Sequence, residues 1–296
     1  MIKVEKLSKK FDKIQILNSL NLNVKKGSIY GLIGTNGAGK TTLIRHIAGV
    51  LCPDSGTVTI DGQPVFDNIK VKERLGYIPD DLYFFSTYNL KEMSRFFKSL
   101  YPCWNQKRFE EMAQSFRLDT GRKLSQFSKG GQKQAAFLLT MSAMPDYLLL
   151  DEPIDGIDPI VRQKLWNFIM DDVADREMTV LVSSHNLREL EGVCDSIGIL
   201  SNGTVSVERD LDDLKSDVHK IQVAYRDRPA SPYEGLTVLH REQRGSVEIL
   251  IVREKREKAE ALIRAGHPAI FDILPLSLEE IFIYEVGGTS HGQILF

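Results

Sequence analysis

A glycine-rich loop at residues 34–41 is the feature that most constrains this chain, because its spacing is G-x-x-x-x-G-K-T. The apolar run at residues 28–33 before it is typical of a buried strand, and apolar residues with helical spacing follow it. Glycines let the backbone amides of such a loop approach phosphate groups, and the positive N-terminal end of the next helix attracts the same groups. We therefore predict a nucleotide-phosphate site formed by Gly34, Thr35, Asn36, Gly37, Ala38, Gly39, Lys40, Thr41 and Thr42.

A second apolar run, at residues 147–152, ends in two carboxylates. Together with the loop, it predicts a division of roles. Lys40 neutralises the β- and γ-phosphates, and Thr41 offers its hydroxyl to Mg²⁺. Asp151 is predicted to hold the Mg²⁺ shell, and Glu152 to polarise the water that attacks the γ-phosphate. Acidic residues at strand ends are also common as solvated side chains. The acidic pair therefore predicts a catalytic site only in combination with the glycine-rich loop.

The order of apolar patterns along the chain predicts an α/β fold. Strand-like runs alternate with helical patterns, as in a parallel sheet with crossover helices. Helical spacing dominates residues 83–145, which we interpret as a helical insertion in a domain that spans residues 1–208. Past this point, short strands and two helices predict a small α+β domain at residues 209–286, and the glycine-containing end at 287–296 predicts a flexible tail.

Composition narrows the classes of protein to which the chain can belong. A hydrophobic content of 42%, a charged content of 26% and a net charge of -2 are ordinary for a soluble globular protein and give no basic field for nucleic acid, so no nucleic acid is expected. Cys52, Cys103 and Cys194 form no CxxC pair, which argues against a zinc site and fits a reducing cytosol. The apolar runs are shorter than the roughly 20 residues of a spanning helix, so a membrane role would need a partner.

The order of these motifs resembles the nucleotide-binding domain of ABC transporters over about residues 1–208. Residues 127–131 (FSKGG) resemble the L-S-G-G-Q signature, with Ser128 and Gly130 at matching positions. Residues 154–158 resemble the D-loop of the same family. The resemblance implies a P-loop fold with a parallel sheet core, an antiparallel β part and a helical subdomain, and it implies ATP and Mg²⁺ as ligands.

The same resemblance implies roles for residues outside the phosphate loop. Ser128 and Gly130 would close over the γ-phosphate of ATP held by a second subunit, although a serine before a helix is also an ordinary N-cap. Asp158 would lie at the dimer interface, and His185, which resembles the switch histidine, would contact the γ-phosphate. Phe11 resembles the aromatic residue that stacks on adenine, and a place in the core is the open alternative for this side chain.

One position departs from the family pattern. Residues 75–79 resemble a strand that a glutamine follows in ABC domains, but here Asp80 takes that place. A carboxylate can still meet Mg²⁺, directly or through water, so Asp80 joins Thr41 and Asp151 as a predicted metal-binding residue. The change puts the coupling or rate of hydrolysis in question. Beyond it, the aromatic residues 83–85 fit either a surface for a partner's coupling helix or packing inside the helical subdomain.

Residues 101–109 and 275–282 are similar to those of ATP-binding subunits of ABC-2-type exporters, especially Ytr-like ones from Gram-positive bacteria. This implies an ATPase that powers an exporter with a separate transmembrane permease. It would act as a homodimer, or as a heterodimer with a paralogue, on the cytoplasmic side of the cell membrane. Two alternatives stay open: a soluble ABC ATPase that acts on ribosomes, DNA or cofactor assembly, and a nucleotide-gated subunit with weak hydrolysis.

Overall fold

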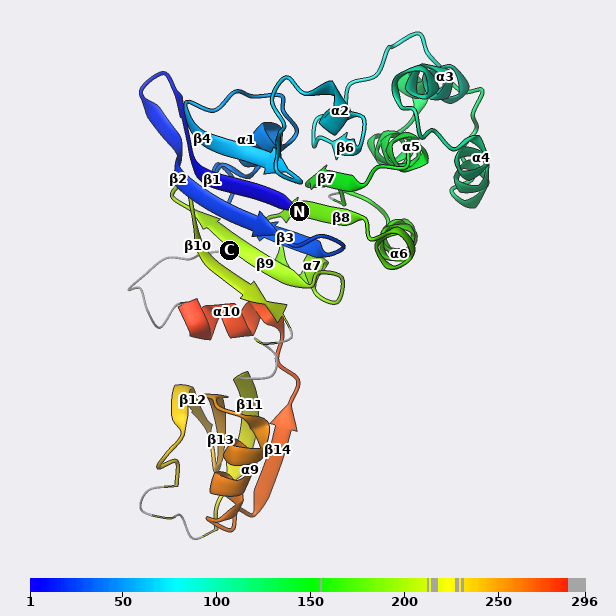
Figure 1. Cartoon of the computed structure of the whole chain (residues 1–296). Helices are drawn as coiled ribbons and strands as arrows, with labels where there is room; N and C mark the ends of the chain where they lie inside the picture. Colours follow the sequence, from blue (N-terminus) through cyan, green and yellow to red (C-terminus); the bar gives the residue numbers. More distant parts are fainter. Residues whose placement is uncertain (155, 212, 214–217, 227–228, 230–231, 287–296) are drawn as a thin grey trace. The chain divides into compact units, whose positions relative to one another are not determined.

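The computed structural model describes residues 1–296 except 155, 212, 214–217, 227–228, 230–231 and 287–296, so the predicted tail lies outside the described residues. The chain divides into two compact units (Figure 1). The first unit contains Met1–His185 and Gly192–Glu208. The second unit contains Asn186–Glu191 and the chain from Arg209 onward. The short segment before Gly192 therefore belongs with the C-terminal part of the chain.

A six-stranded sheet forms the centre of the first unit (Figure 1). Its strands are β3 (Ile29–Ile33), β6 (Leu75–Ile78), β7 (Tyr147–Asp151), β8 (Thr179–Ser184), β9 (Ser196–Ser201) and β10 (Thr204–Asp210). The order is β10-β9-β3-β8-β7-β6, and the pairs β3–β8, β3–β9, β6–β7 and β7–β8 are parallel. Every residue of β3, β7 and β8 is buried, as expected for parallel strands that are covered on both faces. The predicted parallel sheet is confirmed.

An antiparallel sheet with the order β2-β1-β4-β5 packs against the first helix. The elements are β1 (Ile2–Phe11), β2 (Ile14–Val24), β4 (Ser55–Ile60), β5 (Gln63–Pro64), α1 (Lys40–Ile47) and α2 (Ile69–Lys72). The main core lies between this sheet, α1 and the parallel sheet, where Leu43, Ile44 and Ile47 meet Leu149 and Leu181. The apolar face of α1 that the sequence predicts is therefore the face that fixes the phosphate-loop helix in the core.

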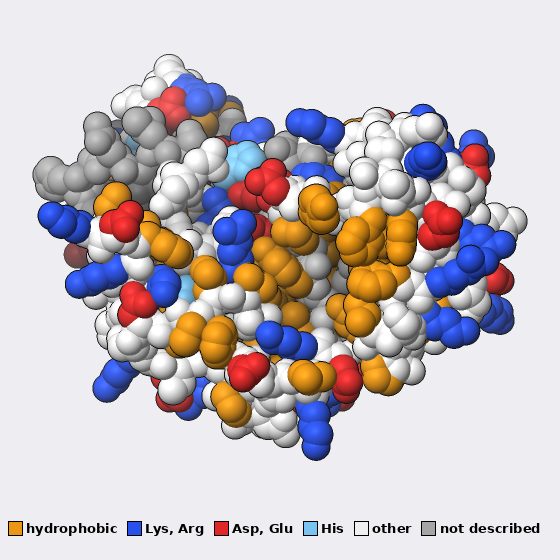
Figure 2. All heavy atoms as spheres, turned by 90° about the horizontal axis from the view of Figure 1, so that it is seen from above, with side chains coloured by type: hydrophobic (Ala, Val, Ile, Leu, Met, Phe, Trp, Pro, Cys, Tyr) orange, Lys and Arg blue, Asp and Glu red, His pale blue; other side chains and the backbone are white. Residues whose placement is uncertain are grey.

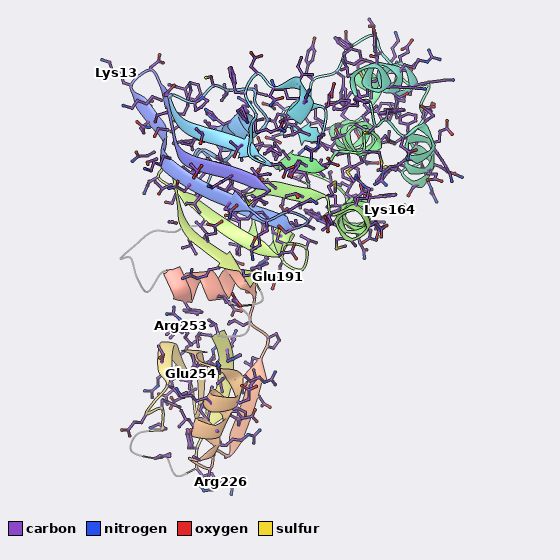
Figure 3. The ribbon with its side chains drawn as sticks, in the orientation of Figure 1. Lys13, Lys164, Glu191, Arg226, Arg253 and Glu254 are labelled. Atoms are coloured by element: carbon purple, nitrogen blue, oxygen red, sulfur yellow. The ribbon has the colours of Figure 1, made fainter. Side chains whose placement is uncertain are left out.

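Helices gather at the β6 end of the parallel sheet (Figure 1). They are α3 (Leu90–Leu100), α4 (Gln106–Ser115), a 3₁₀ turn (Leu124–Gln126), α5 (Lys129–Ser142) and α6 (Pro159–Arg176). Buried Asp172 of α6 accepts hydrogen bonds from Arg108 of α4 at 2.7 Å and from Arg176 at 2.8 Å. Lys164 of α6 (Figure 3) donates to the carbonyl of Ser115 at 3.1 Å. These contacts tie α4 to α6.

The second unit has its own antiparallel sheet and core. Its elements are α7 (Leu187–Leu190), β11 (Val218–Ala224), β12 (Thr237–Arg244), β13 (Val247–Arg253), α9 (Arg256–Arg264), β14 (Ile270–Leu274) and α10 (Leu278–Val286). The sheet order is β12-β13-β11-β14, and Ala259 and Ile263 of α9 pack on its apolar face. Ser277 and Glu280, which stand in an S-x-x-E pattern in the sequence, form a capping box at the start of α10. Among the helices of the described residues, none is long and apolar enough to cross a membrane.

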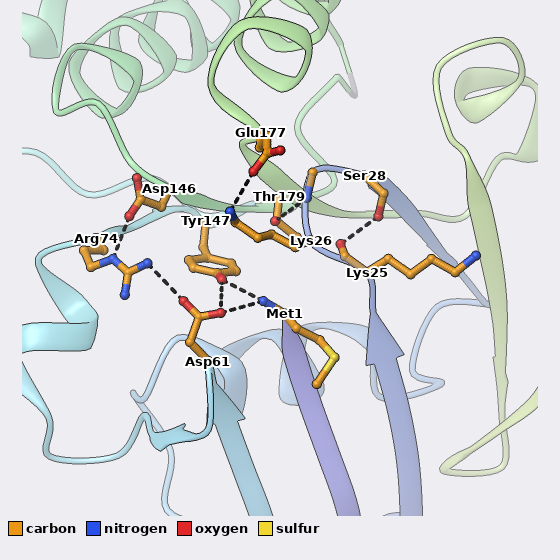
Figure 4. Close-up of polar contacts among 11 residues, drawn as sticks. Met1, Lys25, Lys26, Ser28, Asp61, Arg74, Asp146, Tyr147, Glu177 and Thr179 are labelled. Carbon is orange, nitrogen blue, oxygen red and sulfur yellow. Dashed lines mark hydrogen bonds and ion pairs between the residues drawn. The ribbon is translucent and has the colours of Figure 1, made fainter.

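A polar network in the first unit joins the N-terminus to the ends of β4, β6 and β7 (Figure 4). Asp61 accepts hydrogen bonds from the Met1 amine at 2.8 Å, from the Tyr147 hydroxyl at 2.6 Å and from Arg74 at 3.0 Å. Arg74 also donates to Asp146 at 2.6 Å. Partial burial alone would raise the pKa of Asp61, but the hydrogen bonds from these donors outweigh it and lower the pKa to about 2. The network therefore requires an ionised Asp61.

We expect Asp61→Asn to lower the free energy of unfolding at neutral pH by about 1 kcal/mol, a value reduced for the partial exposure of the carboxylate. The folded pKa of Asp61 lies below its unfolded value, so this stabilisation is present above about pH 4 and is lost as the pH falls towards about 2. Urea unfolding of the two proteins at several pH values measures the difference, with exposed Asp171→Asn as the control. A difference that stays constant with pH would contradict this assignment.

Candidate functional site

The loop at residues 34–39 leaves β3 and ends where α1 begins. Gly39 has a φ of 106°, which suits glycine, and a Cβ there would lie 3.1 Å from the Leu17 side chain. A Cβ at Gly34 would lie 2.7 Å from the carbonyl oxygen of Leu200. Gly39 caps α1 without a side-chain hydrogen bond, so the amide end of the helix is not covered by its own cap. The loop therefore has the steric and polar properties of a phosphate-binding turn.

The other predicted loop residues divide by exposure. Thr35, Asn36 and Gly37 are exposed, while Ala38, Thr41 and Thr42 are half-buried. The amide of Ala38 donates to the carbonyl of Thr35 at 3.1 Å, which closes the turn. The exposed arc of backbone is the part that a ligand could reach from solvent.

Lys40 is a buried cation, with 6% of its surface exposed. Its ammonium donates to the carbonyl of Gly34 at 2.6 Å and to that of Thr35 at 3.3 Å, and it lies 3.1 Å from Oε1 of Glu152. A buried ammonium is costly unless it is paired and hydrogen-bonded. Lys40 thus links the phosphate loop to the end of β7, and it is held where an anionic ligand would offer it further partners.

Asp151 and Glu152 are held by a residue of the neighbouring strand. Ser183 of β8 stands opposite Asp151 in the parallel register. Its hydroxyl donates to Oδ1 of Asp151 at 2.7 Å and accepts from the amide of Glu152 at 3.1 Å. One hydroxyl therefore orients both acidic residues.

Glu152 has an unusual backbone for a residue other than glycine, with a φ of 48°. Its carboxylate lies between two candidate partners: Oε1 is next to Lys40, and Oε2 is 2.9 Å from Nδ1 of His185. The side chain of His185 is 46% exposed. The structure therefore brings together Lys40, Glu152 and His185, which the sequence places in three separate motifs. Left-handed backbone is concentrated at functional sites in proteins, because the surroundings must hold it in place.

The predicted metal-binding residues differ in the hydrogen-bond partners of their carboxylate oxygens. Asp151 is 1% exposed, and its Oδ2 has no hydrogen-bond partner among the described residues. An unpartnered buried carboxylate oxygen at the end of β7 suits a cation with a water shell, and the half-buried Thr41 at the start of α1 offers a hydroxyl of the kind such a cation binds. Asp80 instead pairs with Lys133, at 3.5 Å. No cluster of three or more His, Cys, Asp and Glu side chains suited to a metal occurs in the described ranges, so the Mg²⁺ fit rests on Asp151 and Thr41.

The signature-like residues lie at the start of α5, where Gly130 lines a cavity. Ser128 accepts from the amide of Gly131 at 3.2 Å and caps α5, while Asp158 accepts from the amide of Ile160 at 2.9 Å and caps α6. A cavity of about 510 Å³ lies beside Gly130. Its lining is Asp80, Asp81, Leu82, Lys129, Gly130, Gln132, Lys133 and Gly156. Among these described residues, none comes from the loop at 34–39.

Phe11 lies at the end of β1, where the hairpin to β2 turns near Lys13 (Figure 3). It is 44% exposed, and the ammonium of Lys9 lies 5.6 Å from its ring centroid. This exposure argues against a place in the core, which was the alternative for Phe11. The ring is accessible for stacking with a planar ligand.

Exposed aromatic residues follow β6 in the chain. Tyr83 is 85% exposed and Phe85 is 42% exposed, and the Phe85 ring contacts Tyr88 and Phe96 at centroid distances of 5.1 and 5.5 Å. Figure 2 looks onto the top of the molecule in Figure 1, and hydrophobic side chains gather on this face. Clustered exposed aromatic side chains are typical of a protein–protein contact surface.

Two residues of this site were missed from the sequence. Ser183 lies two residues before His185, and the signal for it is that two parallel strand ends meet at the same edge of a sheet. Lys133 donates to the carbonyl of Glu152 at 3.0 Å, and no local pattern of the sequence identifies it. Both residues act on Glu152 through contacts between segments that are distant in the chain.

We expect Ser183→Ala to lower the free energy of unfolding by about 1–3 kcal/mol, because it removes a hydrogen bond from buried Asp151 and leaves the amide of Glu152 without its acceptor. Denaturant unfolding measures the loss. The matched control is Ser99→Ala, which removes an exposed hydroxyl that bonds within α3. Equal effects of the two substitutions would show that the hydroxyl of Ser183 does not support the acidic pair.

Comparison with known proteins identifies the family. Residues 17–155 match the family described as ABC transporter. The chain is 33% identical to the ABC transporter ATP-binding protein YtrB of Bacillus subtilis (strain 168), over 97% of this chain and 99% of YtrB. It is 32% identical to the bacitracin transport ATP-binding protein BcrA of Bacillus licheniformis, over 73% of this chain and 71% of BcrA. A solved structure of an ATP-binding subunit of an ABC transporter is 29% identical to this chain and has a TM-score of 0.68. The match covers 73% of this chain and 92% of the chain in that structure. The chain therefore belongs to the ABC transporter ATP-binding proteins and is an ATPase of that family.

Proposed function

We propose that this ATPase powers a membrane exporter whose transmembrane part is a separate polypeptide, and that it uses Mg²⁺ with ATP. The position of Glu152 carries the proposal. Its carboxylate lies 3.1 Å from the ammonium of Lys40 and 2.9 Å from the imidazole of His185. A carboxylate held between a phosphate-binding cation and an imidazole is placed to polarise water beside a γ-phosphate.

Each residue of the site has a distinct proposed role in ATP hydrolysis. Lys40 exchanges its ion pair with Glu152 for the β- and γ-phosphates of ATP, so that Glu152 loses one partner and becomes available to water. Thr41 and Asp151 would hold Mg²⁺, which would neutralise charge on the phosphate oxygens. Glu152 accepts the proton of the attacking water, and His185 orients that water. Asp80 is not assigned to the metal in this proposal, since its carboxylate pairs with Lys133 at 3.5 Å.

Two copies of the ATPase, or this chain and a paralogue, are proposed to enclose ATP between them. Ser128 caps α5, and Gly130 lines a cavity whose described lining contains no residue of the loop at 34–39. That the loop at 34–39 does not line this cavity supports a role of the signature on ATP held by a second subunit. Ser128 supplies a hydroxyl and a helix N-terminus for the γ-phosphate, Asp158 lies at the interface between the subunits, and Phe11 stacks on adenine.

The contact with the transmembrane subunit is proposed to involve the exposed aromatic cluster of Tyr83, Phe85, Tyr88 and Phe96. A partner helix that covered these rings would remove a large apolar area from water, which is a strong driving force for association. The chain would then act on the cytoplasmic face of the cell membrane. The names of YtrB and BcrA support a role in transport.

We further propose residues 83–145 as a helical subdomain that transmits the conformational change of the ATPase to the transmembrane partner, and residues 209–286 as a separate small domain.

We expect Glu152→Gln to reduce ATP turnover to background while ATP binding is kept, because glutamine retains the shape of the side chain but cannot accept the proton of water. The substituted chain should accumulate as an ATP-bound dimer. Phosphate release and size-exclusion chromatography with ATP measure the two effects. Glu111→Gln, on the exposed face of α4, is the control. Unchanged turnover in Glu152→Gln would rule out Glu152 as the base.

Copurification of the full chain from gently solubilised membranes tests the partner. Recovery of a protein with several membrane spans is the expected result. Substituting Tyr83 and Phe85 together by serine should reduce this recovery while the ATPase rate of the isolated chain is kept. Recovery of ribosomes or DNA in place of a membrane protein would overturn the transporter proposal and favour a soluble ABC ATPase.

A further inference from the structure

Lys133, in the second turn of α5, connects two segments that follow neighbouring parallel strands. Its ammonium donates to the backbone carbonyl of Glu152 at 3.0 Å and lies 3.5 Å from Oδ1 of Asp80. Only 14% of the Lys133 side chain is exposed, whereas 52% of the Asp80 side chain is exposed. Asp80 lies two residues beyond β6, and Glu152 lies one residue beyond β7. A single lysine thus joins the helical part of the first unit to the site.

The hydrogen bond from Lys133 helps to stabilise the left-handed backbone of Glu152, which is unfavourable for a residue other than glycine. The φ of Glu152 is 48°, and its amide already donates to the hydroxyl of Ser183 at 3.1 Å. With its carbonyl bound to Lys133, the backbone of Glu152 is held on both sides. The direction of a side chain follows the backbone that carries it, so these two bonds set where the carboxylate points.

We propose that Lys133 is a positioning residue for hydrolysis: it holds the carbonyl of Glu152 and thereby directs the carboxylate of Glu152, and Asp80 holds Lys133 in place. The proposal rests on the role of Glu152 as the base. It also gives a reason for a carboxylate at position 80, because Asp80 complements the charge of Lys133. Since Lys133 belongs to α5, a shift of α5 away from the sheet would release the carbonyl of Glu152 and lower the rate of hydrolysis.

If Lys133 bound a phosphate group directly, its loss would change ATP binding and not only the rate of hydrolysis. Lys133 also lines the cavity beside Gly130, so it could contact a phosphate group directly. In that case its loss would weaken the binding of ATP. A positioning residue affects the chemical step instead, so its loss should lower kcat and leave KM and the ATP dissociation constant nearly unchanged.

We test this with the purified full chain and Mg²⁺·ATP, by measuring kcat, KM and ATP binding for Lys133→Met and Lys133→Arg. Methionine keeps the apolar stem and removes the donor, while arginine keeps a charged donor. We expect Lys133→Met to lower kcat roughly 10-fold or more with KM changed less than about twofold, because small misplacements of a catalytic group are costly. Lys133→Arg should keep most of the activity. Lys107→Met removes an exposed lysine that pairs with Glu111 on α4 and is the matched control.

Asp80→Asn tests the second contact. It should reduce kcat by less than Lys133→Met does, and it should add no further loss to Lys133→Met, because both substitutions act through the same ammonium. Unchanged kcat in Lys133→Met, equal loss in Lys133→Arg and Lys133→Met, or a large rise in KM would each overturn the proposal. If Glu152→Gln is inactive while Lys133→Met is fully active, only the positioning role fails. If Glu152→Gln is itself fully active, the proposed function fails first.

Discussion

The site depends on the way in which Glu152 is held. This residue has a left-handed backbone, and its polar groups contact residues from three other parts of the chain. Ser183 of β8 accepts from its amide, Lys133 of α5 donates to its carbonyl, and its two carboxylate oxygens face Lys40 and His185. Such a conformation persists only where the surroundings over-determine it. The sheet, the phosphate-loop helix and the helical part of the unit therefore all converge on one residue.

Charge balance explains why these groups can be buried together. Lys40 is 6% exposed, and Glu152 is its anionic partner at 3.1 Å. A buried cation without such a partner would be strongly destabilising. In the proposed function, the phosphates of ATP would be a second anionic partner for the same ammonium, so binding of ATP would replace one ion pair with another and would leave no charge unpaired. ATP binding and the release of Glu152 would thereby be linked through Lys40.

Asp80, the residue that departs from the family pattern, forms an ion pair in the structure. Asp80 faces Lys133, so that a charged pair stands where related domains carry a neutral glutamine. The same lysine reaches the carbonyl of Glu152. An altered residue near the end of β6 and the candidate base after β7 are therefore connected, which is where we expect the coupling of hydrolysis to the partner to be adjusted.

The sequence by itself determined what depends on local spacing. The loop at residues 34–41, the apolar strands beside it, the capping box of Ser277 and Glu280 and the α/β class all follow from patterns of two to eight residues, because turns, caps and periodic faces are local properties. Short elements such as α2 and α7 were missed, since four residues carry too little periodicity. Only the tertiary structure decided that Phe11 is exposed, that Ser183 holds both acidic residues and that Lys133 joins Asp80 to Glu152. These contacts connect residues far apart in the chain, and they exist because parallel strands end at one edge of a sheet.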